Sequence, residues 1–158
     1  QTVGAVAGFL EKAKKDLQAR NIDLEEVVET RLFEDMRPFR FQVICVANHS
    51  LGAIRALEKG VYKPSEQPAY DYAGLQTLIA ETLEGLRALK PADVNALEGR
   101  DMLFQVGDLK IPFTAENYVM SFAMPNLHFH ATTAYDILRQ KGVPVGKQDY
   151  LGQLRIKR

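Results

Sequence analysis

The segment 114–142, TAENYVMSFAMPNLHFHATTAYDILRQKG, decides the fold class of this chain. Its apolar residues recur at steps of three or four, which is the spacing of one buried face of an α-helix: Leu127, Ala131, Ala134 and Leu138. The hydroxyl of Thr114 can cap the first turn. The segment therefore predicts a long helix over 115–140, and Pro125, which lacks a backbone N–H, is expected to kink it.

Three segments that precede this helix show the same periodicity and predict three further long helices, over 3–17, 38–59 and 72–89. Gly60 supplies the stop of the second helix, and Pro91 supplies that of the third. Asp23 can cap a short helix between the first two. The linker 61–70 and the tail 143–158 lack periodicity, so both are expected to be irregular connections.

A change of period marks residues 101–113, DMLFQVGDLKIPF. Apolar and polar residues alternate on both sides of Gly107 and Asp108, a dipeptide typical of a two-residue hairpin turn. An isolated hairpin is barely stable in water, so we expect this one to lie against the helices.

The predicted fold class is all-α, a single four-helix-bundle domain over 1–158 with a small β-hairpin before the last long helix. The connections are short, so the four apolar stripes are best buried against one another. The composition agrees, because 46% hydrophobic and 25% charged residues are typical of a globular protein with a packed core.

The charge balance and the cysteine content limit the partners and the compartment. Twenty basic residues offset twenty acidic ones, so no net field attracts a nucleic acid, and none is expected as a partner. The start lacks the basic segment of a secretory signal, and no apolar run reaches the roughly 20 residues of a membrane span. The single cysteine, Cys45, cannot form an intrachain disulfide, which suits the reducing cytoplasm. Its apolar neighbours predict an inert, partly buried thiol.

His128 and His130 invite a metal site, but helix geometry separates them. Each residue advances about 100° around the helix axis, so the two imidazoles diverge by roughly 160°. Histidines on one helix share an ion at a separation of three or four residues, not two. Only His130 is expected to face the bundle, whereas His128 is expected on its outer face.

A polar row on the second predicted helix faces the same region. Gln42 and His49 lie one heptad apart at the margin of its apolar stripe, and His130 occupies the equivalent margin of the last helix. We expect Gln42, His49 and His130 to line a site for a small apolar or amphipathic ligand, and Tyr135 is a further candidate for this lining. The alternative is a divalent metal, zinc or nickel, held by His49 and His130 with a carboxylate or water. The incomplete ligand set favours a site without a resident metal.

Two segments resemble a known family. FAMPNLHFHATTAYDILRQKGVPVGKQDYLG, over 122–152, is similar to the C-terminal signature of the DUF1993 proteins, and LFEDMRPFRFQV, over 32–43, is similar to the start of their second helix. The resemblance covers nearly the whole chain. It implies a DinB/YfiT-like four-helix bundle with up-down-down-up helix order, assembled as a homodimer in the cytoplasm. The family label carries no activity, so the function stays open.

Relatives with this fold include metal-dependent enzymes, among them thiol-dependent transferases and isomerases. The resemblance implies a metal held by one histidine on the second helix and by a histidine pair at four-residue spacing on the last. His49 falls at the position of the first. The HxxxH pair is absent, because Thr132 and Ala134 stand four residues after the two histidines. Two functions follow: a homodimeric bundle that binds a small ligand, or a divalent-metal enzyme of the transferase or hydrolase type with an incomplete histidine site.

Overall fold

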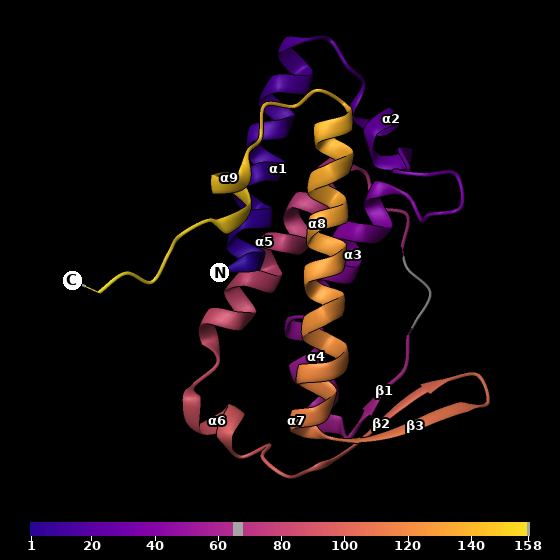
Figure 1. Ribbon diagram of the computed structural model, residues 1–158, viewed down its shortest axis with the longest axis vertical. Coiled ribbons are helices and arrows are strands. Elements are labelled where there is room, and N and C mark those ends of the chain that lie inside the picture. The colour runs from indigo at the N-terminus through magenta and orange to yellow at the C-terminus, as the bar shows by residue number, and fades with distance from the viewer. Residues whose placement is uncertain (65–67, 158) are drawn as a thin grey trace.

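The long helices of the protein run side by side along its longest axis (Figure 1). The computed structural model describes residues 1–64 and 68–157. Helix α1 (Thr2–Ala19) packs on α5 (Tyr72–Ala88) and on α8 (Met124–Gln140), and α3 (Phe39–Asn48) packs on the same two helices. The protein is therefore mostly helical, as the periodicity predicts.

The residues of the predicted apolar stripes form the core. Fully buried side chains come from all four of these helices: Leu10, Leu17, Phe39, Val43, Leu75, Ile79, Ala131, Ala134 and Leu138. Burying one large apolar side chain stabilises a fold by about 1.5 to 3 kcal/mol relative to leaving it in water. Hydrophobic burial along the stripes is thus the main force that holds the helices together.

The segment 38–59 forms two helices, α3 and α4 (Leu51–Lys59), so the prediction of a single helix is wrong. The break lies at Ser50, whose backbone angles of φ −113° and ψ −96° are not helical. The one hydrogen of its hydroxyl is shared between the carbonyls of Val46, at 2.6 Å, and Ala47, at 3.2 Å. At the break, the Ser50 side chain thus partners carbonyls at the end of α3.

The last predicted helix is present but is not uniform. Helix α7 (Ala115–Tyr118) begins after Thr114, whose hydroxyl accepts the backbone N–H of Asn117, as predicted. A π-helical turn (Val119–Ala123) then leads into α8. Pro125 cannot donate a backbone hydrogen bond to the preceding turn, and the wider turn accommodates that loss. The irregularity therefore lies where the proline predicts it.

The predicted hairpin is confirmed. Strands β2 (Asp101–Val106) and β3 (Leu109–Thr114) pair antiparallel and are joined by Gly107 and Asp108. Gly107 has a φ of 57°, a conformation that glycine adopts without steric cost. The turn residues and the alternating pattern thus determine both strands and their register.

A third strand extends this sheet, in a part of the chain that was expected to be irregular. Strand β1 (Val61–Tyr62) pairs in parallel with β2, and the N–H of Leu103 donates to the carbonyl of Gly60 at 3.0 Å. The linker 61–70 therefore begins with a strand. Residues 65–67 of the linker lie outside the described residues, so that part of the prediction is untested.

The base of the sheet lies against the helices, as expected, and its tip does not. Met102 is buried together with Leu97 and Tyr118 in a second, smaller apolar cluster. At the other end, Val106 and Leu109 are exposed, and the hairpin extends away from the helices (Figure 1).

The tail is irregular over 143–146 and 152–157, as predicted, but a short helix lies between these segments, so the prediction is wrong in that part. Residue 158 lies outside the described residues. Helix α9 (Lys147–Leu151) packs on α1. The carboxylate of Asp149 accepts the backbone N–H of Gly146 at 2.7 Å and pairs with the ammonium of Lys12 at 2.9 Å. These two interactions start the helix and attach it to α1.

Two further short helices occupy connections. Helix α2 (Leu24–Glu29) begins after Asp23, whose carboxylate accepts the N–H of Glu25, so the predicted cap is confirmed. Helix α6 (Pro91–Asn95) begins at the proline that was predicted to end the preceding helix. Within the described residues, no helix is long and apolar enough to cross a membrane.

Gly85 on α5 allows this helix to approach α4, because a side chain at this position would overlap Leu51. We expect Gly85→Ala to lower the free energy of unfolding by about 1 to 3 kcal/mol, the usual cost of overpacking. Gly8→Ala on α1 is the matched control, since the space around Gly8 is open and alanine favours a helix by roughly 1 kcal/mol. Urea unfolding measures both variants, and equal effects would contradict the close approach.

Candidate metal centre

Three potential metal ligands meet where α3 lies against α8: Cys45, His49 and His130. One donor atom of each residue lies within 4.8 Å of the donor atoms of the other two. The three residues are buried, with exposed fractions of 7%, 8% and 9%. Cys45 and His49 are one helical turn apart at the end of α3, so they share a face, and His130 approaches them from α8.

Gln42 fixes the orientation of His130. Its Oε1 lies 2.7 Å from Nδ1 of His130, and its Nε2 donates to the carbonyl of Arg37 at 2.8 Å. Because the amide oxygen can only accept, Nδ1 of His130 carries the hydrogen. Nε2 of His130 is then left with a free lone pair, and outer hydrogen bonds of this kind orient histidine ligands in metal sites.

His49 has a different environment. Its ring is parallel to that of His130, with the centroids 5.7 Å apart and an interplanar angle of 4°, and it also stacks on Tyr62. Its Nδ1 is buried and has no hydrogen-bond partner in residues 1–64 and 68–157. An unsatisfied buried polar atom costs about 1 to 3 kcal/mol. A ligand of this nitrogen would remove that cost.

Aromatic side chains enclose the two imidazoles. Phe122 meets the ring of His49 at a steep angle, with the centroids 5.6 Å apart. Phe41 and Phe129 meet the ring of His130 in the same way, at 5.8 and 5.2 Å. The two imidazoles are thereby buried, although Phe129 itself is 55% exposed, and burial strengthens electrostatic interactions inside the site.

Burial sets the charge state of the three donors. It lowers the pKa of His49 and of His130 from 6.5 to about 4, and the neighbouring His49 adds to the shift of His130. It raises the pKa of the Cys45 thiol to about 12. At pH 7 both imidazoles are therefore neutral and keep a free lone pair, while the thiol keeps its proton, in agreement with the predicted inert thiol. Coordination of a metal ion would displace that proton.

The spacing of the donors brings them near the separation that a small metal ion requires. Zinc bonds of about 2.3 Å to sulfur and about 2.0 to 2.1 Å to nitrogen, at tetrahedral angles, place two donor atoms about 3.3 to 3.6 Å apart. The three donor atoms here lie within 4.8 Å of one another. Coordination would therefore draw the side chains closer together.

The structure brings three of the predicted site residues together. Gln42, His49 and His130 meet across the interface of α3 and α8, and His128 is exposed on the outside, as the helical angles predict. That these residues bind a ligand or a metal stays a prediction.

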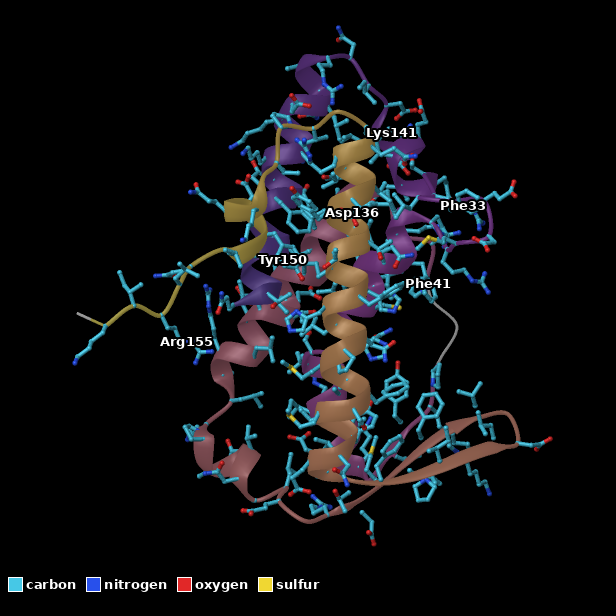
Figure 2. All side chains as sticks on the ribbon, in the orientation of Figure 1. Phe33, Phe41, Asp136, Lys141, Tyr150 and Arg155 are labelled. Carbon is cyan, nitrogen blue, oxygen red and sulfur yellow. The ribbon has the colours of Figure 1, made fainter. Side chains whose placement is uncertain are left out.

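Tyr135 is not part of this group. Its ring packs on Phe9, at 6.4 Å, and on Tyr150, at 6.0 Å. Tyr150 and Phe41, which contacts His130, lie on opposite sides of α8 (Figure 2). The physical reason is the step of five residues between His130 and Tyr135, which turns the helix about 140° beyond one full turn.

Cys45 is the donor that sequence reasoning missed as a ligand. It precedes His49 by four residues, the separation at which two side chains on one helix can share an ion. A search for histidine pairs overlooks this CxxxH spacing. Within the described residues, the third donor of the cluster is thus a thiol and not the expected carboxylate.

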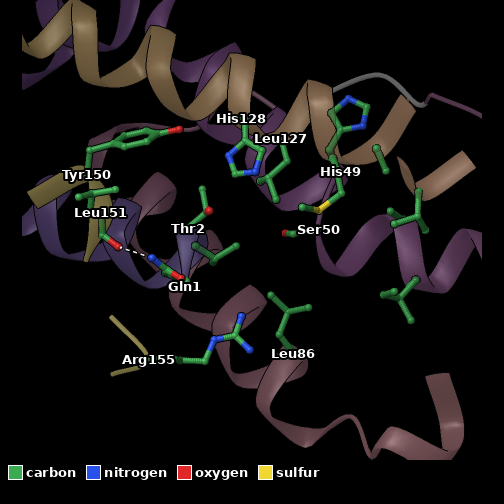
Figure 3. A pocket seen from close by; sticks show the side chains of 16 residues that line it. Gln1, Thr2, His49, Ser50, Leu86, Leu127, His128, Tyr150, Leu151 and Arg155 are labelled. Carbon is green, nitrogen blue, oxygen red and sulfur yellow. Dashed lines mark hydrogen bonds between the residues drawn. The ribbon is translucent and has the colours of Figure 1, made fainter. Parts of the chain in front are cut away.

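A pocket of about 460 Å³ lies beside His49. It does not reach Gln42, so the cavity expected beside that residue is displaced toward α4 and the tail. Figure 3 shows the imidazole of His49 directed away from the middle of the pocket. His49 therefore borders two separate features, the donor cluster and the pocket.

Comparisons with known proteins cover nearly the whole chain. The sequence profile of a family described as a domain of unknown function (DUF1993) matches residues 1–151. The fold is similar to the crystal structure of a DinB family member protein from Shewanella denitrificans, with a TM-score of 0.82 and 26% sequence identity, over 99% of this chain and 89% of that chain. No curated protein matches the chain.

The low pKa values of the two buried histidines predict a loss of stability in mild acid. As the pH falls below 6.5, the unfolded chain takes up protons that the folded protein binds only near pH 4. The free energy of unfolding of the chelator-treated protein should therefore fall by about 2 kcal/mol for each histidine between pH 7 and pH 5. Urea unfolding across this range measures the effect.

Two variants separate this effect from general acid sensitivity. His130→Gln should make the decline shallower by the contribution of one histidine, whereas His128→Gln, at an exposed position, should leave it unchanged. If both variants decline like the parent protein, His130 is not buried in its neutral form.

Proposed function

The chain belongs to the DUF1993 family, and we propose that it binds one divalent transition-metal ion through Cys45, His49 and His130. The observation that carries the proposal is Nδ1 of His49. This nitrogen is buried, lacks a hydrogen-bond partner in the described part of the chain, and belongs to an imidazole beside two further donors. A metal ion would use the lone pairs that the cluster leaves unpaired.

The types of donor favour zinc. A thiolate and two imidazoles suit zinc and, after it, copper or nickel, whereas magnesium and calcium prefer oxygen ligands. Gln42 supports this assignment, because it holds His130 with Nε2 as the free nitrogen. Of the two metals considered from the sequence, zinc and nickel, the thiol makes zinc the better candidate.

Three protein ligands leave one tetrahedral position for water or a substrate, which is the ligand count of catalytic zinc sites. A metal there would supply Lewis-acid chemistry, which suits a transferase or hydrolase activity. The chain itself contributes the fixed orientation of His130 through Gln42 and the burial of both imidazoles among aromatic rings.

The proposed ligand set differs from the one that the family resemblance implies. There, the pair at four-residue spacing lies on the last long helix and consists of histidines. Here, such a pair lies at the end of α3, as Cys45 and His49, and α8 contributes only His130. The number of ligands is the same, and the missing HxxxH pair is therefore no argument against a metal.

We also assign the long helices to a DinB/YfiT-like four-helix bundle with up-down-down-up order, in which α3 and α4 together are the second helix. The mutual packing of α1, α3, α5 and α8 supports this assignment. So does the TM-score of 0.82 with the DinB family member.

Our second proposal is that a small ligand binds between the helices, in the pocket beside His49. Its volume of about 460 Å³ lies within the usual range of ligand sites, roughly 300 to 1,000 Å³. This proposal replaces Gln42, His130 and Tyr135 as lining residues, because none of them borders the pocket, and it keeps only His49.

We further propose that the protein is a homodimer, as the family resemblance implies. Three apolar side chains of the π-helical turn and α8 are exposed in the single chain, by 40% to 71%: Met120, Met124 and Phe129. A dimer interface would bury such side chains.

Light scattering tests the dimer. We expect twice the mass of one chain across micromolar concentrations, and Met120→Lys should shift the protein toward the monomer. Phe33→Lys is the control, because Phe33 is equally exposed but belongs to the connection between α2 and α3. A monomer mass for the parent protein at all concentrations would refute the proposal.

Cobalt binding tests the metal centre. We expect protein purified without a nickel column and treated with a chelator to bind Co²⁺ in a one-to-one ratio, with the intense ultraviolet absorption of a cobalt–thiolate bond. Cys45→Ser should abolish that absorption. Gln42→Leu should weaken binding about ten- to a hundredfold, because it removes the outer partner of a ligand.

His128→Gln is the matched control for these variants, since it removes an exposed imidazole from the same helix as His130. It should bind cobalt like the parent protein. The metal proposal fails if the parent protein shows no stoichiometric binding, or if Cys45→Ser retains the absorption.

A further inference from the structure

The pocket beside His49 is built from segments that are far apart in the sequence. Thr2 of α1, Ser50 before α4, Leu86 of α5, Leu127 of α8 and Arg155 of the tail all border it (Figure 3). Helices α1, α4, α5 and α8 all contribute, so the cavity exists only in the folded protein.

The walls of the pocket are mostly apolar. Side chains without polar atoms come from four helices and the π-helical turn: Val3, Ala53, Ile54, Leu86, Ala123 and Leu127. An aliphatic chain placed along them would leave water, which stabilises binding by roughly 25 cal/mol for each Å² buried.

No acidic side chain is present in the described lining of the pocket. Arg155 carries a positive charge, and the other polar side chains provide imidazoles, hydroxyls and one amide: His49, His128, Thr2, Ser50, Tyr150 and Gln1. Within the described residues, the guanidinium of Arg155 has no hydrogen bond or ion pair to another side chain. Asp149, the acidic residue on α9, is already paired with Lys12 at 2.9 Å.

The pocket has one charged end, because the one charged side chain of its described lining lies at one side of it. Figure 3 shows Arg155 and His49 at opposite sides of the pocket, with Leu86, Leu127 and Ser50 between them. A ligand with one charged end would therefore place that end at Arg155 and its apolar part along the helices.

We propose that this pocket binds a medium-chain monocarboxylate, with the carboxylate on Arg155. The planar guanidinium matches a carboxylate in a two-point contact. One cation balances one negative charge, whereas a phosphate monoester would call for more than a single arginine. The inference rests on the second function proposed above, that the pocket holds a small ligand, and it does not require the metal.

Calorimetric titration with octanoate tests this proposal, on chelator-treated protein and on zinc-loaded protein. We expect saturable binding in both forms, weaker binding of octanol, which lacks the charge, and no binding of octylamine, which reverses it. Acetate, which lacks the apolar chain, should not bind. Because the titration includes metal-free protein, a failure of the metal centre cannot be mistaken for a failure of the pocket.

Arg155→Gln should weaken octanoate binding at least about tenfold, the cost of losing a charge-assisted hydrogen bond. Arg55→Gln is the matched control, because Arg55 is an exposed arginine next to Ile54 that does not border this pocket. Ile54→Trp, at a partly exposed wall position, should weaken binding by filling the cavity.

The proposal is overturned if octanoate does not bind either form. It is also overturned if octanol binds as tightly as octanoate, or if Arg155→Gln binds octanoate as tightly as Arg55→Gln. Circular dichroism of each variant shows whether the fold is kept. If Ile54→Trp proves unfolded, the comparison of the two arginine variants still decides the question.

Discussion

The hydrogen bond between Nδ1 of His130 and Oε1 of Gln42 is the interaction on which the arrangement of the donor cluster depends. It connects α8 to α3 at 2.7 Å, and both residues are buried. Breaking it would leave two polar groups without partners, at a cost of about 1 to 3 kcal/mol for each. The apolar stripes hold α3 and α8 together, but apolar contacts tolerate small shifts along the helix. The polar pair selects one register, and in that register the ring of His130 lies parallel to that of His49.

The break at Ser50 has a complementary role. Because α3 ends just before it, His49 stands at the point where one helix stops and the next begins. Its side chain belongs to the cluster with Cys45, while the residues that follow it border the pocket. The break at Ser50 thus lies between two candidate sites, the donor cluster and the pocket, which share His49.

Much of the candidate site follows from helical geometry alone. The predicted directions of His130, inward, and His128, outward, match the structure because α8 is a regular helix from Met124 onward and the π-helical turn lies before it. Gln42 and His49 lie on one face, as predicted, because both residues precede the break at Ser50. The same geometry argues against Tyr135, since five residues from His130 lead to a different face.

Sequence by itself determined the features that depend on neighbours along the chain: the apolar stripes, the caps at Asp23 and Thr114, and the hairpin turn at Gly107. Only the tertiary structure decided which stripes face one another, the pairing of β1 with β2, and the place of α9 on α1. It also decided that Cys45 joins the two histidines. The reason is that the periodicity of a sequence indicates only the direction of each side chain around its own helix. A ligand shared between helices also depends on the distances between side chains of different helices, and these are set by the packing of the whole core.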